Sequence, residues 1–468
     1  MWVLWRALLS LVLLVGAGWF WTGAKSDAAG PGKGEAPEEI RIRHGAVEVA
    51  GNHGSTPDVR AGSLPPSIGA PRATVTDTQA ADFHFELGVV EPDEGDDLEP
   101  WQVAVGDVTG DRRPDVVMSL NYSGNAPNRG HVRVRVYAQA PGGTLARPVE
   151  FDVDAPSPRH GMELVDLDRN GIPEIAVVDG VRMTLFRRVG GTFERSGHVG
   201  LSDGIYPAPI DADGDGFMDL FAQGWDYGAD VFLGDGRGNI RGTDHIDSPS
   251  SPDATVEASD FTADGLADVV VQSGHAVRIY PSRYQLALGA PIEFDLARMQ
   301  VSAPSGMTVA DMDRDGRPDL VVSDQGDVNT TPVPKGVHIL YRVAGNFFGD
   351  SVFLDTGAGY LWPGAVRVAD VDGNGYPDVI AMLHSQDRMG YFLQGASGFA
   401  PMVTQLVDDD PFTNSTYYDN SFAIADVNSD RCPDVVLADQ SSSLRVLYGR
   451  NCQVTLPRPS TPLPPRKR

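Results

Sequence analysis

Seven short segments of the chain carry carboxylate and amide side chains at alternate positions, a pattern that suits the binding of a hard cation. Position 1 is Asp in every copy, position 3 is Asp, Asn or Thr, position 5 is Asp or Asn, and position 9 is Asp or Glu. Oxygen donors at this spacing let a tight loop wrap one ion, as in the first half of an EF-hand loop. A donor set of oxygens alone favours Ca²⁺ over zinc or copper. The segments are DVTGDRRPD (107–115), DLDRNGIPE (166–174), DADGDGFMD (211–219), DFTADGLAD (260–268), DMDRDGRPD (311–319), DVDGNGYPD (370–378) and DVNSDRCPD (426–434).

Up to seven Ca²⁺ are therefore predicted, each held by positions 1, 3, 5 and 9 of one loop. The loops that begin at residues 211 and 311 have four carboxylates each and are predicted to bind most strongly, followed by those at 166 and 370 and then by that at 260. Arg112 and Arg431 stand where the other five loops have a turn Gly, so the loops at 107 and 426 are predicted to bind weakly or not at all. Acidic turns that only solvate the surface are the alternative, which seven copies in phase disfavour. The predicted ligands are Asp107, Thr109, Asp111, Asp115, Asp166, Asp168, Asn170, Glu174, Asp211, Asp213, Asp215, Asp219, Asp260, Thr262, Asp264, Asp268, Asp311, Asp313, Asp315, Asp319, Asp370, Asp372, Asn374, Asp378, Asp426, Asn428, Asp430 and Asp434.

The segments that must position these loops read as β-strands. An apolar, β-branched run follows every loop and another precedes most of them, so each loop joins two strands of a hairpin. The loops recur about every 53 residues, and two further strand candidates usually follow each hairpin, such as 131–139 and 147–153. This pattern predicts an all-β, seven-bladed β-propeller. The last unit is one strand short, so residues 81–90 (ADFHFELGVV) are predicted to complete blade seven and close the ring.

The repeat unit, for example VAVGDVTGDRRPDVV or VRVADVDGNGYPDVI, resembles FG-GAP/VCBS-like repeats. The resemblance covers about residues 81–456 and implies a calcium-binding propeller like that of integrin α subunits. It implies that positions 1, 3, 5 and 9 of each loop bind Ca²⁺, and Thr109 and Thr262 depart from the usual Asp or Asn. Such repeats occur in adhesins, lectins and some polysaccharide lyases, so the resemblance leaves the ligand open.

The two ends of the chain differ from the repeat region. Residues 1–24 contain an apolar run, Ala7–Trp21, after a basic residue, and are predicted to be a signal peptide or an uncleaved membrane anchor. Residues 25–80 are predicted to be a flexible Pro/Gly/Ala-rich linker, and residues 457–468 a disordered, Pro-rich basic tail. The protein is therefore predicted to be exported, to the periplasm, the cell surface or the medium, with its N-terminal segment as a possible anchor.

The net charge bears on the kind of partner, and the two cysteines bear on the covalent structure. The chain has 64 Asp and Glu against 37 Lys and Arg, a net charge of −27, which disfavours nucleic acid as a partner. Cys432 and Cys452 lie 20 residues apart on either side of a predicted hairpin and are predicted to form a disulfide, the alternative being two free buried thiols.

A possible ligand site lies at the opposite end of the blades from the acidic loops. Segments that enter the first strand of several blades contain aromatic or His residues, predicted either to line a ligand funnel or to pack between blades: Trp101, His160, Tyr206, Trp362 and Tyr417. The predicted function is a monomeric module that binds a surface protein or a polysaccharide. A propeller-fold lyase or hydrolase is the alternative, with His160 as its one suggestive base. The sequence contains no HExxH, GxSxG, P-loop or GxGxxG motif, which makes an enzyme the less favoured of the two predictions.

Overall fold

The computed structural model of the chain describes residues 82–88, 98–122, 131–154, 160–179, 181–201, 206–224, 228–246, 254–283, 288–326, 334–343, 347–357, 362–384, 388–407, 421–438 and 444–453. The predicted N-terminal segment 1–24, the linker 25–80 and the tail 457–468 lie outside the described residues. Within the described residues, no helix is long and apolar enough to cross a membrane.

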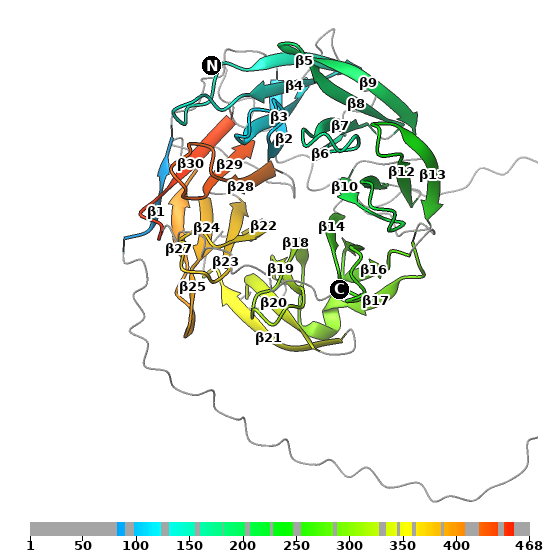
Figure 1. Ribbon diagram of the computed structural model, residues 1–468. Helices are drawn as coiled ribbons and strands as arrows, with labels where there is room; N and C mark the ends of the chain where they lie inside the picture. The colour runs from blue at the N-terminus through cyan, green and yellow to red at the C-terminus, as the bar shows by residue number, and fades with distance from the viewer. Residues whose placement is uncertain are drawn as a thin grey trace, which may run out of the picture. The chain divides into compact units, whose positions relative to one another are not determined.

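Seven antiparallel four-stranded sheets form the blades of a ring (Figure 1), all within the compact unit Thr74–Arg468. The predicted seven-bladed all-β propeller is confirmed. Blade 1 consists of β2 (Leu98–Gly106), β3 (Asp115–Tyr122), β4 (His131–Tyr137) and β5 (Val149–Asp154), and blade 2 of β6 (Gly161–Val165), β7 (Glu174–Val178), β8 (Arg182–Val189) and β9 (Thr192–Gly200). Blade 3 consists of β10 (Tyr206–Ile210), β11 (Asp219–Gln223), β12 (Ala229–Gly234) and β13 (Ile240–Ile246), and blade 4 of β14 (Thr255–Ser259), β15 (Asp268–Ser273), β16 (Ala276–Tyr280) and β17 (Ile292–Asp295).

The remaining blades repeat the same order, with small additions. Blade 5 consists of β18 (Pro304–Ala310), β19 (Asp319–Asp324), β20 (Gly336–Val343) and β21 (Phe347–Asp355), and blade 6 of β22 (Trp362–Ala369), β23 (Asp378–His384), β24 (Arg388–Phe392) and β27 (Val403–Leu406). Blade 7 consists of β28 (Phe422–Ala425), β29 (Asp434–Ala438), β30 (Leu444–Arg450) and β1 (His84–Leu87). A short hairpin of β25 (Gln394–Gly395) and β26 (Gly398–Phe399) extends blade 6, and a 3₁₀ turn, η1 (Leu296–Met299), follows β17.

The position of each strand in its blade follows from its hydrophobic pattern. The second strand of a blade is an apolar run such as EIAVV in β7, and it is buried along its whole length because another blade covers each face. The fourth strand alternates, as VEFDVD does in β5, because one of its faces is open to solvent. Seven apolar clusters result, and each is shared by two neighbouring blades. The core of the protein is thus a set of interfaces between blades.

The ring closes where the two ends of the propeller meet. Strand β1 pairs antiparallel with β30, from His84 opposite Arg450 to Leu87 opposite Leu447, so the predicted closing strand is confirmed. Phe85 is 2% exposed, and its ring lies 5.1 Å from that of Phe83 and 5.3 Å from that of Tyr391 in blade 6. The closing strand therefore contributes both backbone hydrogen bonds and apolar packing.

A disulfide joins Cys432, two residues before β29, to Cys452, two residues after β30. The sulfur atoms are 2.02 Å apart, and the bond spans the 20 residues of the blade-7 hairpin. It lies on the hairpin that receives the closing strand, so two covalently linked strands present the edge to which β1 binds.

Replacing Phe85 tests the closing strand. The Phe85→Ala substitution is expected to lower the free energy of unfolding by about 3–5 kcal/mol, because it empties a buried aromatic site between blades 6 and 7. Urea unfolding followed by tryptophan fluorescence measures the change. The matched control is His84→Ala in the same strand, whose exposed side chain is expected to contribute less than about 0.5 kcal/mol. Equal losses in the two variants would contradict closure through Phe85.

Candidate metal centre

The acidic loops all join the first strand of a blade to the second. The first strands surround the centre of the ring in Figure 1, so the seven loops occupy equivalent places around one face. In the loop that follows β10, Asp211 Oδ1 accepts the N–H of Asp215 at 3.1 Å and Oδ2 that of Gly216 at 2.9 Å. Asp215 Oδ1 in turn accepts the N–H of Phe217 at 2.9 Å. These local bonds fold the backbone around the carboxylates before any ion arrives.

Two residues of each loop adopt the left-handed backbone conformation. Position 6 does so as Gly216 at φ 83°, and Arg112 and Arg431 do so at 67° and 75°. The turn therefore forms in the loops at 107 and 426 without the Gly, although a side chain in this conformation costs energy. Position 4 is also left-handed, for example as Ala263 at φ 58° and Arg314 at 63°. The sequence carried a weak signal for this second turn position, which is Gly in three of the loops.

The carboxylate at position 9 joins the loop to the third strand of its blade. In six loops one of its oxygens accepts an N–H from position 2 or 3 of the same loop, and the other accepts an N–H at the end of the third strand or just beyond it, all at 2.7–3.1 Å. All six side chains belong to residues with 0% exposure: Asp115, Asp219, Asp268, Asp319, Asp378 and Asp434. Position 9 is thus a structural bridge as well as a possible ligand.

Four of the seven loops bring carboxylates close enough to share one ion. In each group, one oxygen from each of three residues lies within 4.8 Å of the others. Oxygens bound to one Ca²⁺ at about 2.3–2.6 Å can be at most about 5 Å apart, so these groups match the size of that ion. The groups are Asp166, Asp168 and Glu174; Asp211, Asp213 and Asp219; Asp311, Asp313 and Asp315; and Asp370, Asp372 and Asp378.

The remaining three loops differ at position 3. Thr109 and Thr262 occupy it in the loops at 107 and 260, and there the position-9 carboxylate accepts their backbone N–H instead of that of position 2. In the loop at 426, Asn428 Nδ2 donates to Asp430 Oδ2 at 3.0 Å and also contacts Asp434 Oδ1 at 3.4 Å. In these loops a hydroxyl or an amide replaces the position-3 carboxylate.

One atom in the loop at 370 directly fits a bound cation. Asp370 Oδ1 is buried and has no hydrogen-bond partner among the described residues, whereas its Oδ2 accepts the N–H of Gly375 at 2.8 Å. The pKa of neighbouring Asp372 is raised by burial and by the Asp370 carboxylate. A buried, unsatisfied carboxylate oxygen beside a second carboxylate is costly without a counter-charge, and a divalent cation supplies one.

Arginine side chains reach several of these loops. Arg241 Nη2 in β13 contacts Asp213 Oδ2 and lies 2.9 Å from Asp215 Oδ2. Arg317 pairs with Asp315 inside its own loop. Arg450 Nη1 lies 2.8 Å from Asp430 Oδ2. These guanidinium groups neutralise part of the acidic charge from the rim of each loop, a feature that reading the loops alone did not identify.

Burial raises the pKa of the position-9 carboxyl in all seven loops. The pKa is about 6 for Asp219 and for Asp319, about 7 for Asp434 and about 8 for Asp378, and neighbouring carboxylates in the same loop add to the effect of burial. Backbone N–H donors oppose these shifts without cancelling them. A metal-free chain therefore holds carboxyl groups that take up protons near neutral pH.

Three of the predicted funnel residues, Trp101, His160 and Trp362, make contacts across blade boundaries. Trp101 Nε1 donates to the carbonyl of His160 at 3.1 Å, and the two rings lie 6.2 Å apart between blades 1 and 2. His160 is 2% exposed, which disfavours a role as a general base that has to reach a substrate. Lys335 Nζ lies 4.9 Å from the ring of Trp362, joining blades 5 and 6, and Tyr206 opens β10. Tyr417 lies outside the described residues.

Comparison with known families identifies the repeat. Residues 166–222, 211–271 and 260–322 each match the family described as FG-GAP-like repeat, which spans blades 2 to 4 and the start of blade 5. No curated protein matches the chain. These three FG-GAP-like repeats, set in a ring of seven blades, confirm the resemblance to an FG-GAP-repeat β-propeller noted from the sequence.

Several solved structures resemble the chain at low sequence identity. A structure of BBS1N in complex with ARL6DN is 10% identical, with a TM-score of 0.50 over 80% of this chain and 98% of that chain. A lectin from Agrocybe aegerita, solved for its recognition of non-reducing terminal N-acetylglucosamine, is 18% identical, with a TM-score of 0.45 over 68% of this chain and 81% of that chain. The WD40 domain of Toxoplasma gondii coronin is 10% identical, with a TM-score of 0.44 over 79% and 90% of the two chains. The likeness to BBS1N shows the propeller fold alone.

The raised pKa values predict how pH changes the stability of the metal-free chain. The position-9 carboxyls bind protons more tightly in the folded than in the unfolded chain, whose Asp pKa is about 3.8, so the folded state holds more protons above that pH. In EDTA, the free energy of unfolding is therefore expected to fall as the pH rises from ~5 to ~8. Urea unfolding at several pH values measures the slope. A metal-free stability that rises over this range would contradict burial of these groups.

Proposed function

We propose that this FG-GAP-repeat β-propeller is an exported binding module whose blade loops hold Ca²⁺. The observation that carries the calcium proposal is the set of four loops in which three carboxylate oxygens lie within 4.8 Å of one another. The loops at 166, 211, 311 and 370 would hold the ions, and they are the four that the sequence ranked highest. The loops at 260, 107 and 426 would bind more weakly because a hydroxyl or an amide replaces the carboxylate at position 3.

The role of the ion follows from the bonds around position 9. A cation among the carboxylates would offset their mutual repulsion and stabilise a loop that is already tied to the third strand through its backbone N–H bonds. The ion would thus stabilise the junction of three strands in each occupied blade. The propeller fold fits a binding module. A rigid face of ordered loops on it would be suited to recognising a surface protein or a polysaccharide.

Export is supported by two independent features of the chain. Ala7–Trp21 is a short apolar run after a basic residue, typical of a signal peptide or a membrane anchor. The Cys432–Cys452 disulfide is a bond that forms and persists in oxidising compartments. Millimolar extracellular Ca²⁺ would keep sites of moderate affinity occupied, which the cytosol would not.

Calcium binding is tested by thermal unfolding in EDTA and in excess Ca²⁺. Saturating Ca²⁺ is expected to raise the melting temperature, because an ion at about 100 times its Kd stabilises the folded state by about 2.7 kcal/mol per site. The Asp372→Asn variant is expected to melt higher than the wild type in EDTA, because it removes one of three clustered carboxylates, but to gain less from Ca²⁺. An unchanged wild-type melting temperature would contradict the calcium proposal.

The matched control removes the same charge outside the loops. Asp244 is exposed on β13 and belongs to none of the acidic groups, so the Asp244→Asn variant is expected to keep the full response to Ca²⁺. A response reduced equally in both variants would indicate a general charge effect instead of a site.

Export and binding are tested on the full chain in its host and after purification. Cell fractionation is expected to find the protein outside the cytosol, and cytosolic protein alone would contradict export. The purified protein, applied to immobilised polysaccharides in Ca²⁺, is expected to be retained without release of fragments. Release of fragments would instead favour the lyase or hydrolase alternative, and the absence of retention would leave a protein as the partner.

A further inference from the structure

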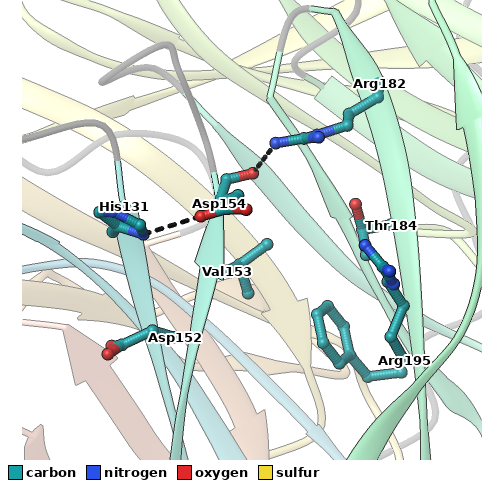
Figure 2. A pocket seen from close by; sticks show the side chains of 8 residues that line it. His131, Asp152, Val153, Asp154, Arg182, Thr184 and Arg195 are labelled. Atoms are coloured by element: carbon teal, nitrogen blue, oxygen red, sulfur yellow. Dashed lines mark hydrogen bonds and ion pairs between the residues drawn. The ribbon is translucent and has the colours of Figure 1, made fainter.

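A pocket of about 340 Å³ lies between the outer strands of blades 1 and 2, away from the acidic loops. Its volume falls in the range of about 300–1,000 Å³ that is usual for small-molecule sites. Strands β4 and β5 form one wall and strands β8 and β9 form the other, as Figure 2 shows. The residues that line it are His131, Asp152, Val153, Asp154, Arg182, Thr184, Phe186 and Arg195.

Most charged groups of the wall are already paired. Asp152 Oδ1 lies 3.0 Å from Arg133 Nε, and Asp154 Oδ1 lies 3.1 Å from His131 Nδ1. Arg182 pairs with Asp179 at 3.2 Å and donates to the carbonyl of Asp154, the contact drawn in Figure 2. The ion pairs lie within one blade each and leave the wall nearly neutral, and the Arg182 bond to the Asp154 carbonyl joins the two blades.

Arg195 is the exception. It is exposed, lines the pocket and pairs with no acidic group among the described residues. A β-bulge at Ser196 sets its direction: Leu185 lies opposite Gly197 and Phe186 opposite Arg195, so Ser196 is the extra residue, and its hydroxyl donates to the Leu185 carbonyl at 3.2 Å. The bulge places Arg195 on the same face of the blade as Phe186, toward blade 1. Bulges of this kind re-aim side chains at functional sites.

The rest of the lining restricts the kind of anion that fits. The Thr184 side chain lies beside Arg195 in Figure 2, and Phe186 supplies an apolar surface. Asp152 already accepts hydrogen bonds from Arg133 and from the Tyr122 hydroxyl, and Asp154 Oδ1 pairs with His131. Each carboxylate offers about four lone pairs, so both can accept a further hydrogen bond from a hydroxyl group of a ligand. A guanidinium for one carboxylate, two acceptors for hydroxyls and one aromatic face together match a hydroxylated acid.

We propose that the pocket between blades 1 and 2 binds a sugar acid, with Arg195 as the ligand of its carboxylate and Asp152 and Asp154 as acceptors for its hydroxyl groups. The pocket uses no residue of the acidic loops, so the proposal is independent of calcium binding. If the pocket does not bind a sugar acid, the melting temperature would still respond to Ca²⁺. If the loops do not bind Ca²⁺, the pocket could still bind a sugar acid.

Titration of the full chain with glucuronate, by calorimetry or by ligand-detected NMR, tests the site. Binding is expected at concentrations up to ~10 mM, and glucose, the neutral counterpart, is expected to bind at least about tenfold more weakly because it cannot pair with Arg195. Equal binding of glucose, or no binding of glucuronate, would overturn the proposal. Sulfate that binds as tightly as glucuronate would overturn the role given to the hydroxyl groups.

Two variants on the same blade locate the binding. Arg195→Gln is expected to weaken glucuronate binding at least about tenfold without a change in melting temperature, since the side chain is exposed. Arg187→Gln removes the same charge from an exposed residue of β8 on the opposite face of the sheet and is expected to bind as the wild type does. Wild-type affinity in Arg195→Gln, or equal losses in both variants, would overturn the assignment.

The source of the acid is resolved by a further arm of the titration. A tetrasaccharide with internal uronate residues that binds more tightly than glucuronate would support a polysaccharide chain as the source. Equal or weaker binding of the tetrasaccharide would support a free or terminal sugar acid.

Discussion

The position-9 carboxylate is the interaction on which the blades depend. It is an ionisable group at 0% exposure in six of the seven loops, and it remains in place because two backbone N–H groups from different parts of the blade donate to it. In Asp219, for example, these donors are Ala212 in the loop and Gly234 at the end of β12. Burying a charge is costly unless it is hydrogen-bonded and balanced, so the blade needs both its backbone geometry and a counter-charge nearby.

The counter-charge comes in two forms, and the composition of the chain reflects both. Divalent cations are the form that the clustered oxygens suit, and guanidinium groups such as that of Arg241 are the other. The chain has four Lys among its 37 basic residues, and Arg is the better choice here because its planar fork keeps its charge and can contact two carboxylates at once. Near the axis, Arg367 of blade 6 lies 4.0 Å from Glu257 of blade 4. Burial raises the pKa of Glu163 in blade 2 to about 7, and the positive charge of Arg367 partly offsets this rise.

Much of the fold could be predicted from the sequence because the repeat makes one local pattern appear seven times. Each buried second strand and each acidic loop is a signal within a dozen residues, and even the closing strand could be found because residues 81–90 resemble the other fourth strands. Three features of the sites could not be predicted in this way, because each depends on a partner on another strand or on a bulge. They are the second role of position 9 as a bridge to the third strand, the contact of Arg241 with Asp213, and the direction of Arg195 after the bulge at Ser196. Aromatic residues such as Trp101 gave an ambiguous pattern, because packing between blades and exposure in a funnel require the same residue types.

The pairing of β1 with β30 also sets an order of events during synthesis. Glu86 and Arg450, which form an ion pair across these strands, are 364 residues apart in the chain. At about 5–20 residues per second, β1 would wait roughly 20–70 s after its own synthesis before its partner exists. During that interval, blades 1 to 6 can assemble on one another while the apolar side of β1, with Phe85, stays without its final cover. The ring therefore cannot close before β30 has been synthesised, however early the other blades form.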